Sequence, residues 1–174
     1  MKRDGSPRGV VLAAFAGLML GILGTLACQP TPPAAQQAAT EPSVPSVPVR
    51  RVILPEKTPK TGFPYSPGIL VGNTLYIAGH LGRDPVKTDL VSGGIEAETR
   101  QSLANIREVL MGAGMDFKDV TSVTAYITDF KEFEKFNAVY REHFPTDPPA
   151  RATVQVAALN VGAHVELQMI AVKP

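Results

Sequence analysis

The chain has 174 residues with 19% charged side chains and a formal net charge of +1 at pH 7. This length fits one domain of ordinary size, and the charge excludes a basic stripe of the kind that binds nucleic acid. Lys2, Arg3, Arg8 and Asp4 precede Cys28, so the rest of the chain carries 14 positive and 15 negative side chains, which argues against polyanionic partners. Because Cys28 is the only cysteine, an intramolecular disulfide is excluded.

An apolar run of mostly small residues occupies positions 10–27, behind the basic start of the chain. A basic front, an apolar N-terminal stretch and small residues at its end are typical of a signal segment. The run is also about long enough to span a membrane, so an uncleaved anchor with an incidental cysteine is the alternative. Thr25-Leu26-Ala27-Cys28 is similar to a bacterial lipobox, in which the cysteine is lipidated and becomes the new N-terminus.

Residues 1–28 are therefore predicted to be a lipoprotein-type signal segment, with lipidation at Cys28. Several acyl chains would hold the protein on a membrane surface, because their burial energies add. The predicted location is the cell envelope after export, facing the periplasm if the source is a diderm bacterium. Gln29 after Cys28, in place of an aspartate, favours the outer membrane.

Residues 29–49 are rich in proline, alanine, glutamine and serine. Such a composition cannot form a core and predicts an extended, disordered tether. The folded domain is predicted to occupy residues 50–174.

The first part of this domain predicts three strands and a helix. Residues 50–54 alternate in polarity, and residues 69–71 and 74–78 flank a Gly72-Asn73 turn that is typical of a hairpin. Residues 95–113 predict a helix, because apolar residues recur at helical spacing and glycines follow. The polar residues of that helix are assigned to a solvated face.

The second part predicts a strand over residues 120–128 and a helix over residues 131–144. Asn137 in that helix is expected to make a local hydrogen bond. Two runs with period-two alternation follow, residues 149–159 and 165–172, and they predict a terminal hairpin. Arg151 and Thr153 then share one face of the first run, and Glu166 lies on the face opposite Val165 and Leu167 in the second. His143, at the end of the helix, and His164, at the start of the last strand, are expected at the surface.

The order β-β-β-α-β-α-β-β indicates an α+β domain with helices on one face of a mixed sheet. Three stretches resemble the Rid family (reactive intermediate deaminases, also called YjgF). They are F-P-Y-S-P-G…V-G-N-T-L-Y-I-A-G-H in residues 63–80, E-T-R-Q-S-L-A-N-I-R-E-V-L-x-x-A-G in residues 98–114, and P-A-R-x-T-V-x-V-x-x-L with V-E-L-x-M-I-A-V in residues 149–172. The resemblance covers about residues 50–174 and implies a chorismate-mutase-like Rid fold with three subunits packed around an axis.

The residues show no nucleophile–base pair of the triad kind, no metal-ligand spacing and no glycine-rich phosphate loop. An arginine and a glutamate remain as chemical groups. Arginine grips a carboxylate with two parallel hydrogen bonds, and a partly buried glutamate positions a water and moves its proton. The resemblance implies the matching reaction, which is the hydrolysis of 2-imino acids, tautomers of enamines, to 2-keto acids and ammonia, with no cofactor.

The resemblance also implies roles for five residues. Arg151 binds the substrate carboxylate, and Glu166 orients and activates water. Gly79, placed just after the third strand, and Thr153 fix the substrate through their backbones, while Tyr65 forms a wall of the site. Thr153 departs from the family, which carries cysteine or serine there, and is tolerated if that position acts through its backbone.

His80 and Gln168 are further departures, because the family commonly has glutamine and glutamate at these positions. They leave the substrate preference open. In the predicted hairpin Glu166 lies opposite Val156, which places Arg151 about 16 Å away at ~3.3 Å per residue. That distance is too long for one small imino acid, so Arg151 is expected to meet Glu166 and Tyr65 of a neighbouring subunit in a homotrimer.

Two other functions fit the same residues. One is a non-catalytic trimeric binder of small carboxylates at the cell envelope, which export favours, because imino acids arise chiefly where cytoplasmic pyridoxal enzymes work. The other is a structural trimer in which Arg151 and Glu166 form an inter-subunit ion pair. A site on a fold does not by itself guarantee the reaction.

Overall fold

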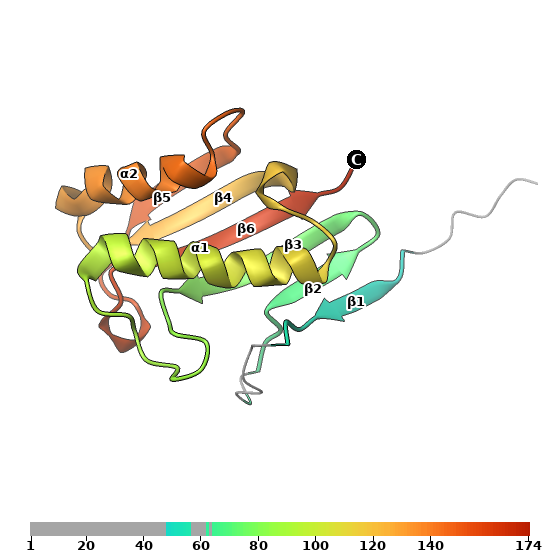
Figure 1. The fold of residues 1–174 in the computed structure, drawn as a ribbon, viewed down its shortest axis with the longest axis horizontal. Helices are drawn as coiled ribbons and strands as arrows, with labels where there is room; N and C mark the ends of the chain where they lie inside the picture. Colours follow the sequence, from blue (N-terminus) through green and yellow to red (C-terminus); the bar gives the residue numbers. More distant parts are fainter. Residues whose placement is uncertain (1–47, 57–61, 63) are drawn as a thin grey trace, which may run out of the picture. The chain divides into compact units, whose positions relative to one another are not determined.

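The computed structural model describes residues 48–56, 62 and 64–174, and these form one sheet with two long helices beside it (Figure 1). The predictions for the signal segment, for lipidation at Cys28 and for residues 29–47 of the tether lie outside the described residues. Among the residues that the structure describes, neither helix is both long and apolar enough to cross a bilayer.

The order of elements predicted from the sequence is confirmed. The strands and helices are β1 (Arg50–Ile53), β2 (Gly68–Val71), β3 (Thr74–Leu81), α1 (Gly94–Gly112), β4 (Val120–Ile127), α2 (Phe133–His143), β5 (Ala150–Gln155) and β6 (Val165–Val172). α2 begins two residues later than predicted, because a 3₁₀ turn over Phe130–Glu132 precedes it. The Asp129 side chain caps that turn by accepting from the Lys131 N–H at 2.9 Å.

The predicted terminal hairpin is wrong. The sheet order is β1-β2-β3-β6-β4-β5, so β4 lies between β5 and β6. β5 runs parallel to β4, with Val123 opposite Arg151, whereas β6 runs antiparallel to β4, with Tyr126 opposite Glu166. The helix α2 supplies the crossover that a parallel pair requires. Period-two alternation predicts which face a residue takes, but it does not say which strand becomes the neighbour.

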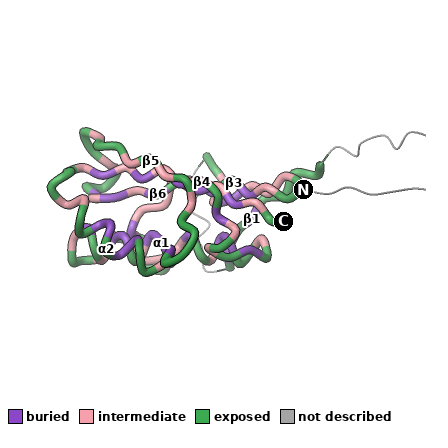
Figure 2. The backbone as a smooth tube through the Cα atoms, turned by 90° about the horizontal axis from the view of Figure 1, so that it is seen from above, coloured by how far each residue is buried: buried purple, intermediate pink, exposed green. Residues whose placement is uncertain are grey.

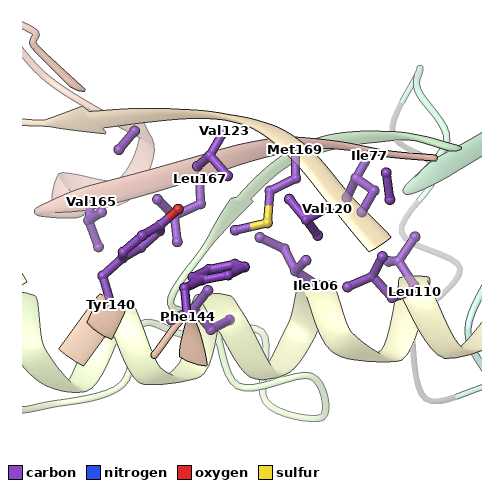
Figure 3. Packing of buried hydrophobic residues seen from close by; sticks show 14 of the residues in the cluster. Ile77, Ile106, Leu110, Val120, Val123, Tyr140, Phe144, Val165, Leu167 and Met169 are labelled. Atoms are coloured by element: carbon purple, nitrogen blue, oxygen red, sulfur yellow. The ribbon is translucent and has the colours of Figure 1, made fainter. Parts of the chain in front are cut away.

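Both helices lie on the same side of the sheet (Figure 2). That face carries an apolar core, in which Tyr140 and Phe144 on the helix side point toward Leu167 and Met169 on the sheet (Figure 3). Burying each large apolar side chain contributes roughly 1.5–3 kcal/mol, so this core fixes which face of every strand is inward. The buried residues of β3, β4 and β6 are Leu75, Ile77, Val120, Val123, Ala125, Ile127, Val165, Leu167, Met169 and Ala171.

The prediction that the polar residues of α1 form a solvated face is wrong for three of them. Glu98, Thr99 and Ser102 are buried. Buried polar groups need hydrogen-bond partners, and each of these has one. Thr99 donates to the Ile95 carbonyl at 2.6 Å, and Ser102 donates to the His80 carbonyl at 2.8 Å. The helix is therefore docked on β3 by hydrogen bonds as well as by apolar contacts.

Candidate active site

Glu166 and Gly79 form the centre of the candidate site on the sheet face away from the helices. A Cβ atom built on Gly79 would fall 1.9 Å from Oε1 of Glu166, so the carboxylate occupies the space that a side chain at position 79 would need. Burial raises the pKa of Glu166 above its ordinary value of 4.5. A carboxyl group with a raised pKa takes up and releases a proton closer to neutral pH, which suits a general base.

The sequence analysis predicted Gly79 just after the third strand, but the structure places it inside β3. The pairing of β3 with β6 shifts between Ile77 and His80, so Ala78 and Gly79 together lie opposite Gln168. Two residues opposite one is a β-bulge, and bulges re-aim side chains near functional sites. The bulge places Gly79 against Glu166.

The loop that carries Tyr65 is fastened beside this bulge. Pro67 accepts a hydrogen bond from the Ala78 N–H at 2.9 Å, next to Gly79 in the chain. Tyr65 itself is 58% exposed.

Arg151 lies on the helix side of the sheet, in a cradle of aromatic rings from α2. Its guanidinium carbon is 4.4 Å from the ring centre of Tyr140 and 5.2 Å from that of Phe136. Its Nη2 donates to Oδ1 of Asn137 at 2.8 Å. The expectation of a local hydrogen bond for Asn137 is therefore wrong, because this side chain reaches across to β5.

Tyr140 stays neutral beside this cation. Burial raises the pKa of its hydroxyl to about 12, although the nearby charge of Arg151 acts in the opposite direction. The aromatic cradle therefore adds no negative charge around Arg151. Cation–π contacts of this kind hold a guanidinium in place.

Thr153 lies on β5, which is an edge strand of the sheet. Val156 N–H donates to the Ile127 carbonyl on β4. Successive residues of a strand point their backbone groups to opposite edges, and Thr153 is three residues before Val156. The backbone N–H and C=O of Thr153 accordingly point to the free edge, where a substrate or another chain can pair with them.

Within one chain the predicted residues form two separate groups. Gly79 and Glu166 meet on the sheet face away from the helices, which we call the open face, whereas Arg151 and Thr153 are on the face that carries the helices. Through β4, Arg151 and Glu166 are three residues apart along the strand and two strands apart, or roughly 14 Å at ~3.3 Å per residue and ~4.8 Å per strand. The sequence analysis predicted that Arg151 and Glu166 are held apart along a hairpin of two paired strands. In the structure β4 lies between their strands and keeps them apart.

The three histidines differ in their surroundings. Burial lowers the pKa of His80 to about 4, so its ring is neutral near pH 7. His143 packs edge-on against Phe117. The ring of His164 is 43% exposed, but its Nδ1 lies 2.6 Å from the buried Glu98 carboxylate, a contact that the sequence did not reveal. Among the described residues, no group of three or more His, Cys, Asp and Glu side chains is placed to hold a metal ion.

Comparisons with known proteins agree with this architecture. The model of the family described as Endoribonuclease L-PSP matches residues 55–173. The 2-iminobutanoate/2-iminopropanoate deaminase of Capra hircus is 46% identical over 125 residues, which are 72% of this chain and 91% of that protein. The Homo sapiens protein of the same name is 42% identical over the same shares of both chains.

A solved structure from Yersinia pestis, described as a member of the conserved Rid protein family, is similar to this chain with a TM-score of 0.69. It is 37% identical and covers 72% of this chain and 100% of its own. The chain belongs to the Endoribonuclease L-PSP family, which is the Rid family that the sequence motifs resemble. The fold predicted from that resemblance is confirmed.

The space at Gly79 leads to a prediction about Glu166. In Gly79→Ala the new methyl group meets the mobile end of a side chain, so the fold should persist while the carboxylate swings toward solvent. We expect the Glu166 carboxyl to titrate closer to 4.5, measured by NMR.

Gly82→Ala is the matched control, because a Cβ there would lie 2.4 Å from the Glu98 Cα in the helix backbone. Overpacking against backbone should cost roughly 1–3 kcal/mol in the free energy of unfolding. A Gly79→Ala protein that is as destabilised as Gly82→Ala, with an unmoved Glu166 titration, would contradict the assignment.

Proposed function

We propose that this protein hydrolyses 2-imino acids to 2-keto acids and ammonia. The observation that carries the proposal is the partly buried Glu166 carboxylate, packed over the bare backbone of Gly79 on the sheet face away from the helices. The goat and human relatives, which are named for the deamination of 2-iminobutanoate and 2-iminopropanoate, support the same reaction.

The proposed reaction begins with water held by Glu166. As the water oxygen attacks C2 of the protonated imine, Glu166 takes a proton and the C=N electron pair moves to nitrogen. Glu166 then returns this proton to the amine of the tetrahedral intermediate. Glu166, ionised again, takes the hydroxyl proton as the C–N bond breaks and the hydroxyl becomes a carbonyl. It then passes this proton to the departing ammonia, which leaves as ammonium. No oxidation state changes, so water is the only co-reactant that this route requires.

Arg151 binds the substrate carboxylate in this proposal. Its guanidinium is stacked on neutral rings and hydrogen-bonded to the neutral amide of Asn137, so its charge is left for an anionic ligand. The backbone of Thr153 at the free edge, the N–H of Gly79 and the wall at Tyr65 complete the site.

The site is shared between subunits of a homotrimer in this proposal, so that Arg151 of one subunit faces Glu166 and Tyr65 of the next. Arg151 and Glu166 lie on opposite faces of one sheet, which supports the sharing. The open face also carries Tyr76 and Val154, which are 50% and 45% exposed. Uncovered apolar side chains on a sheet face are typical of a surface that meets another subunit.

The protein is further proposed to be a cell-envelope lipoprotein, anchored through a lipid on Cys28. The apolar run at residues 10–27 and the lipobox-like Thr25-Leu26-Ala27-Cys28 support this. The anchor would hold a deaminase, or a carboxylate binder, at a membrane surface.

Turnover is tested with 2-iminopropanoate and 2-iminobutanoate generated in situ. Arg151→Ala should lower kcat/KM by about 10²-fold or more, because it removes a charged partner of the carboxylate. Glu166→Gln should lower kcat by about 10²- to 10⁴-fold, because it removes the base. Arg141→Ala and Glu134→Gln are matched controls, since this pair is exposed on α2, with a contact of 3.8 Å. A folded oligomer that binds a 2-keto acid without accelerating imine loss would instead be the non-catalytic binder.

The same assay has a pH signature. Glu166 acts as a base only when it is ionised, so activity falls as the pH drops through its pKa. Because burial raises this pKa, the acid limb should lie above 4.5 and disappear in Glu166→Gln. An acid limb that persists in Glu166→Gln belongs to another group.

Subunit sharing is tested by mixing two inactive proteins. Arg151→Ala supplies an intact Glu166, and Glu166→Gln supplies an intact Arg151. If each site takes one residue from each of two subunits, refolding an equal mixture should restore about one quarter of the sites in a ring of three. Recovery of no activity, from mixed oligomers verified by mass spectrometry, would place both residues in a site within one chain.

The membrane anchor is tested in the full chain expressed in a diderm bacterium. The wild-type protein should sediment with membranes and lose residues 1–27 from its mass. Cys28→Ser should abolish both lipidation and membrane association, because the acyl chains provide the binding energy. A Cys28→Ser protein that still sediments with membranes would support the uncleaved apolar anchor.

A further inference from the structure

Glu98 is a buried carboxylate that holds one residue by two contacts. Its Oε2 accepts from the backbone N–H of His164 at 2.7 Å, and its Oε1 lies 2.6 Å from Nδ1 of the same residue. The Glu98 side chain is 3% exposed. A buried carboxylate needs hydrogen-bond donors, and His164 provides both a backbone donor and a ring donor.

The backbone of Glu98 also packs against the end of β3. A Cβ atom on Gly82 would lie 2.4 Å from the Cα of Glu98, so only glycine allows the strand to come this close. Gly82 follows Gly79 by three residues, and His164 precedes Glu166 by two. One residue of α1 therefore holds both chain segments that bring Gly79 and Glu166 together.

The link from His164 to Glu166 is short and packed. The His164 carbonyl accepts from Thr128 N–H at 3.1 Å, which ties it to the end of β4. Val165 is fully buried and lies opposite Ile127, and Glu166 then lies opposite Tyr126. A shift at His164 therefore displaces the start of β6 and the carboxylate that it carries.

We propose that Glu98 is a positioning residue for Glu166, acting through His164 at the start of β6. The proposal rests on the function proposed above, because Glu166 is the base of that reaction. The two-point contact with His164, which we call the clamp, holds the Glu166 carboxylate over Gly79.

The charge of the clamp depends on pH, because the ring of His164 can be protonated. Its pKa is raised above 6.5, first by the hydrogen bond with Glu98 and then by the charges of Glu98 and Glu132, while desolvation acts in the opposite direction. The charged clamp therefore stabilises the fold fully below pH 6.5, and this part is lost as the pH rises through the raised pKa. A neutral ring can still donate through Nδ1–H, so the wild-type clamp persists at both ends of the range.

Glu98→Gln separates positioning from charge. The amide oxygen of the glutamine can accept from the backbone N–H of His164, and its NH2 group can donate to an unprotonated Nδ1 of the neutral ring. When the ring is protonated, Nδ1 is a second donor, and the NH2 group cannot accept from it. We expect kcat of Glu98→Gln to fall about tenfold below pH 6.5 and to approach the wild-type value at higher pH. KM should change less than kcat, because Arg151 is on the other face of the sheet.

Two further variants complete the test. Glu98→Ala, which lacks the clamp at every pH, should lower kcat by about 10²-fold throughout. Glu96→Ala removes an exposed carboxylate from the same helix turn and should match the wild type. The Glu166 carboxyl titration, followed by NMR, gives a second measure that needs no turnover. The pKa of Glu166 should move toward its ordinary value of 4.5 in both Glu98 variants.

The proposal is overturned if Glu98→Gln has the same kcat–pH profile as Glu96→Ala. It is also overturned if the loss is equal at every pH and follows the loss of folded protein. If the wild type is active but the Glu166 titration is unmoved in both Glu98 variants, the positioning role of Glu98 is wrong and the deaminase function stands. If the wild type is inactive but the Glu166 titration moves in those variants, the positioning role of Glu98 stands and the deaminase function is wrong.

Discussion

The position of β6 between β3 and β4 is the constraint on which the candidate site depends. Both neighbours pair with β6 in antiparallel register, and its inward residues Val165 and Leu167 are fully buried. A slip by one residue would exchange the two faces and drive Glu166 into the apolar core, where an unpaired charge is costly. The apolar packing therefore sets the orientation of the carboxylate, and the bulge at Gly79 provides the space that it needs.

The surroundings of Arg151 follow a different principle, because the protein holds this cation with neutral groups. Asn137 offers an amide oxygen and Tyr140 a phenol whose pKa is about 12. None of the salt bridges among the described residues involves Arg151. A carboxylate at the position of Asn137 would compete with an anionic substrate for the guanidinium. Neutral partners instead orient the guanidinium and leave its charge available.

The sequence predicted the elements, their order and the face of Glu166, because all three depend on local periodicity. It failed where a long-range partner decides the outcome. The alternation of β5 and β6 is the same whether they pair with each other or with β4, so the hairpin was a natural but wrong inference. Glu98 looks like a surface residue of α1 until the chain brings His164, 66 residues later, against it. The polarity of a residue does not reveal such a partner.

The departures from the family pattern at Thr153 and His80 leave the charges of the candidate site unchanged. Thr153 presents its backbone to the free edge of β5, and a threonine side chain leaves those N–H and C=O groups in place. His80 has a pKa of about 4, so it is as neutral near pH 7 as the glutamine common in the family. Both departures change the shape of the candidate site, while its cation, Arg151, and its carboxylate, Glu166, remain. In the proposed reaction their effect should therefore fall on which side chain a small anionic substrate carries, because the proposed partner of its carboxylate, Arg151, is unchanged.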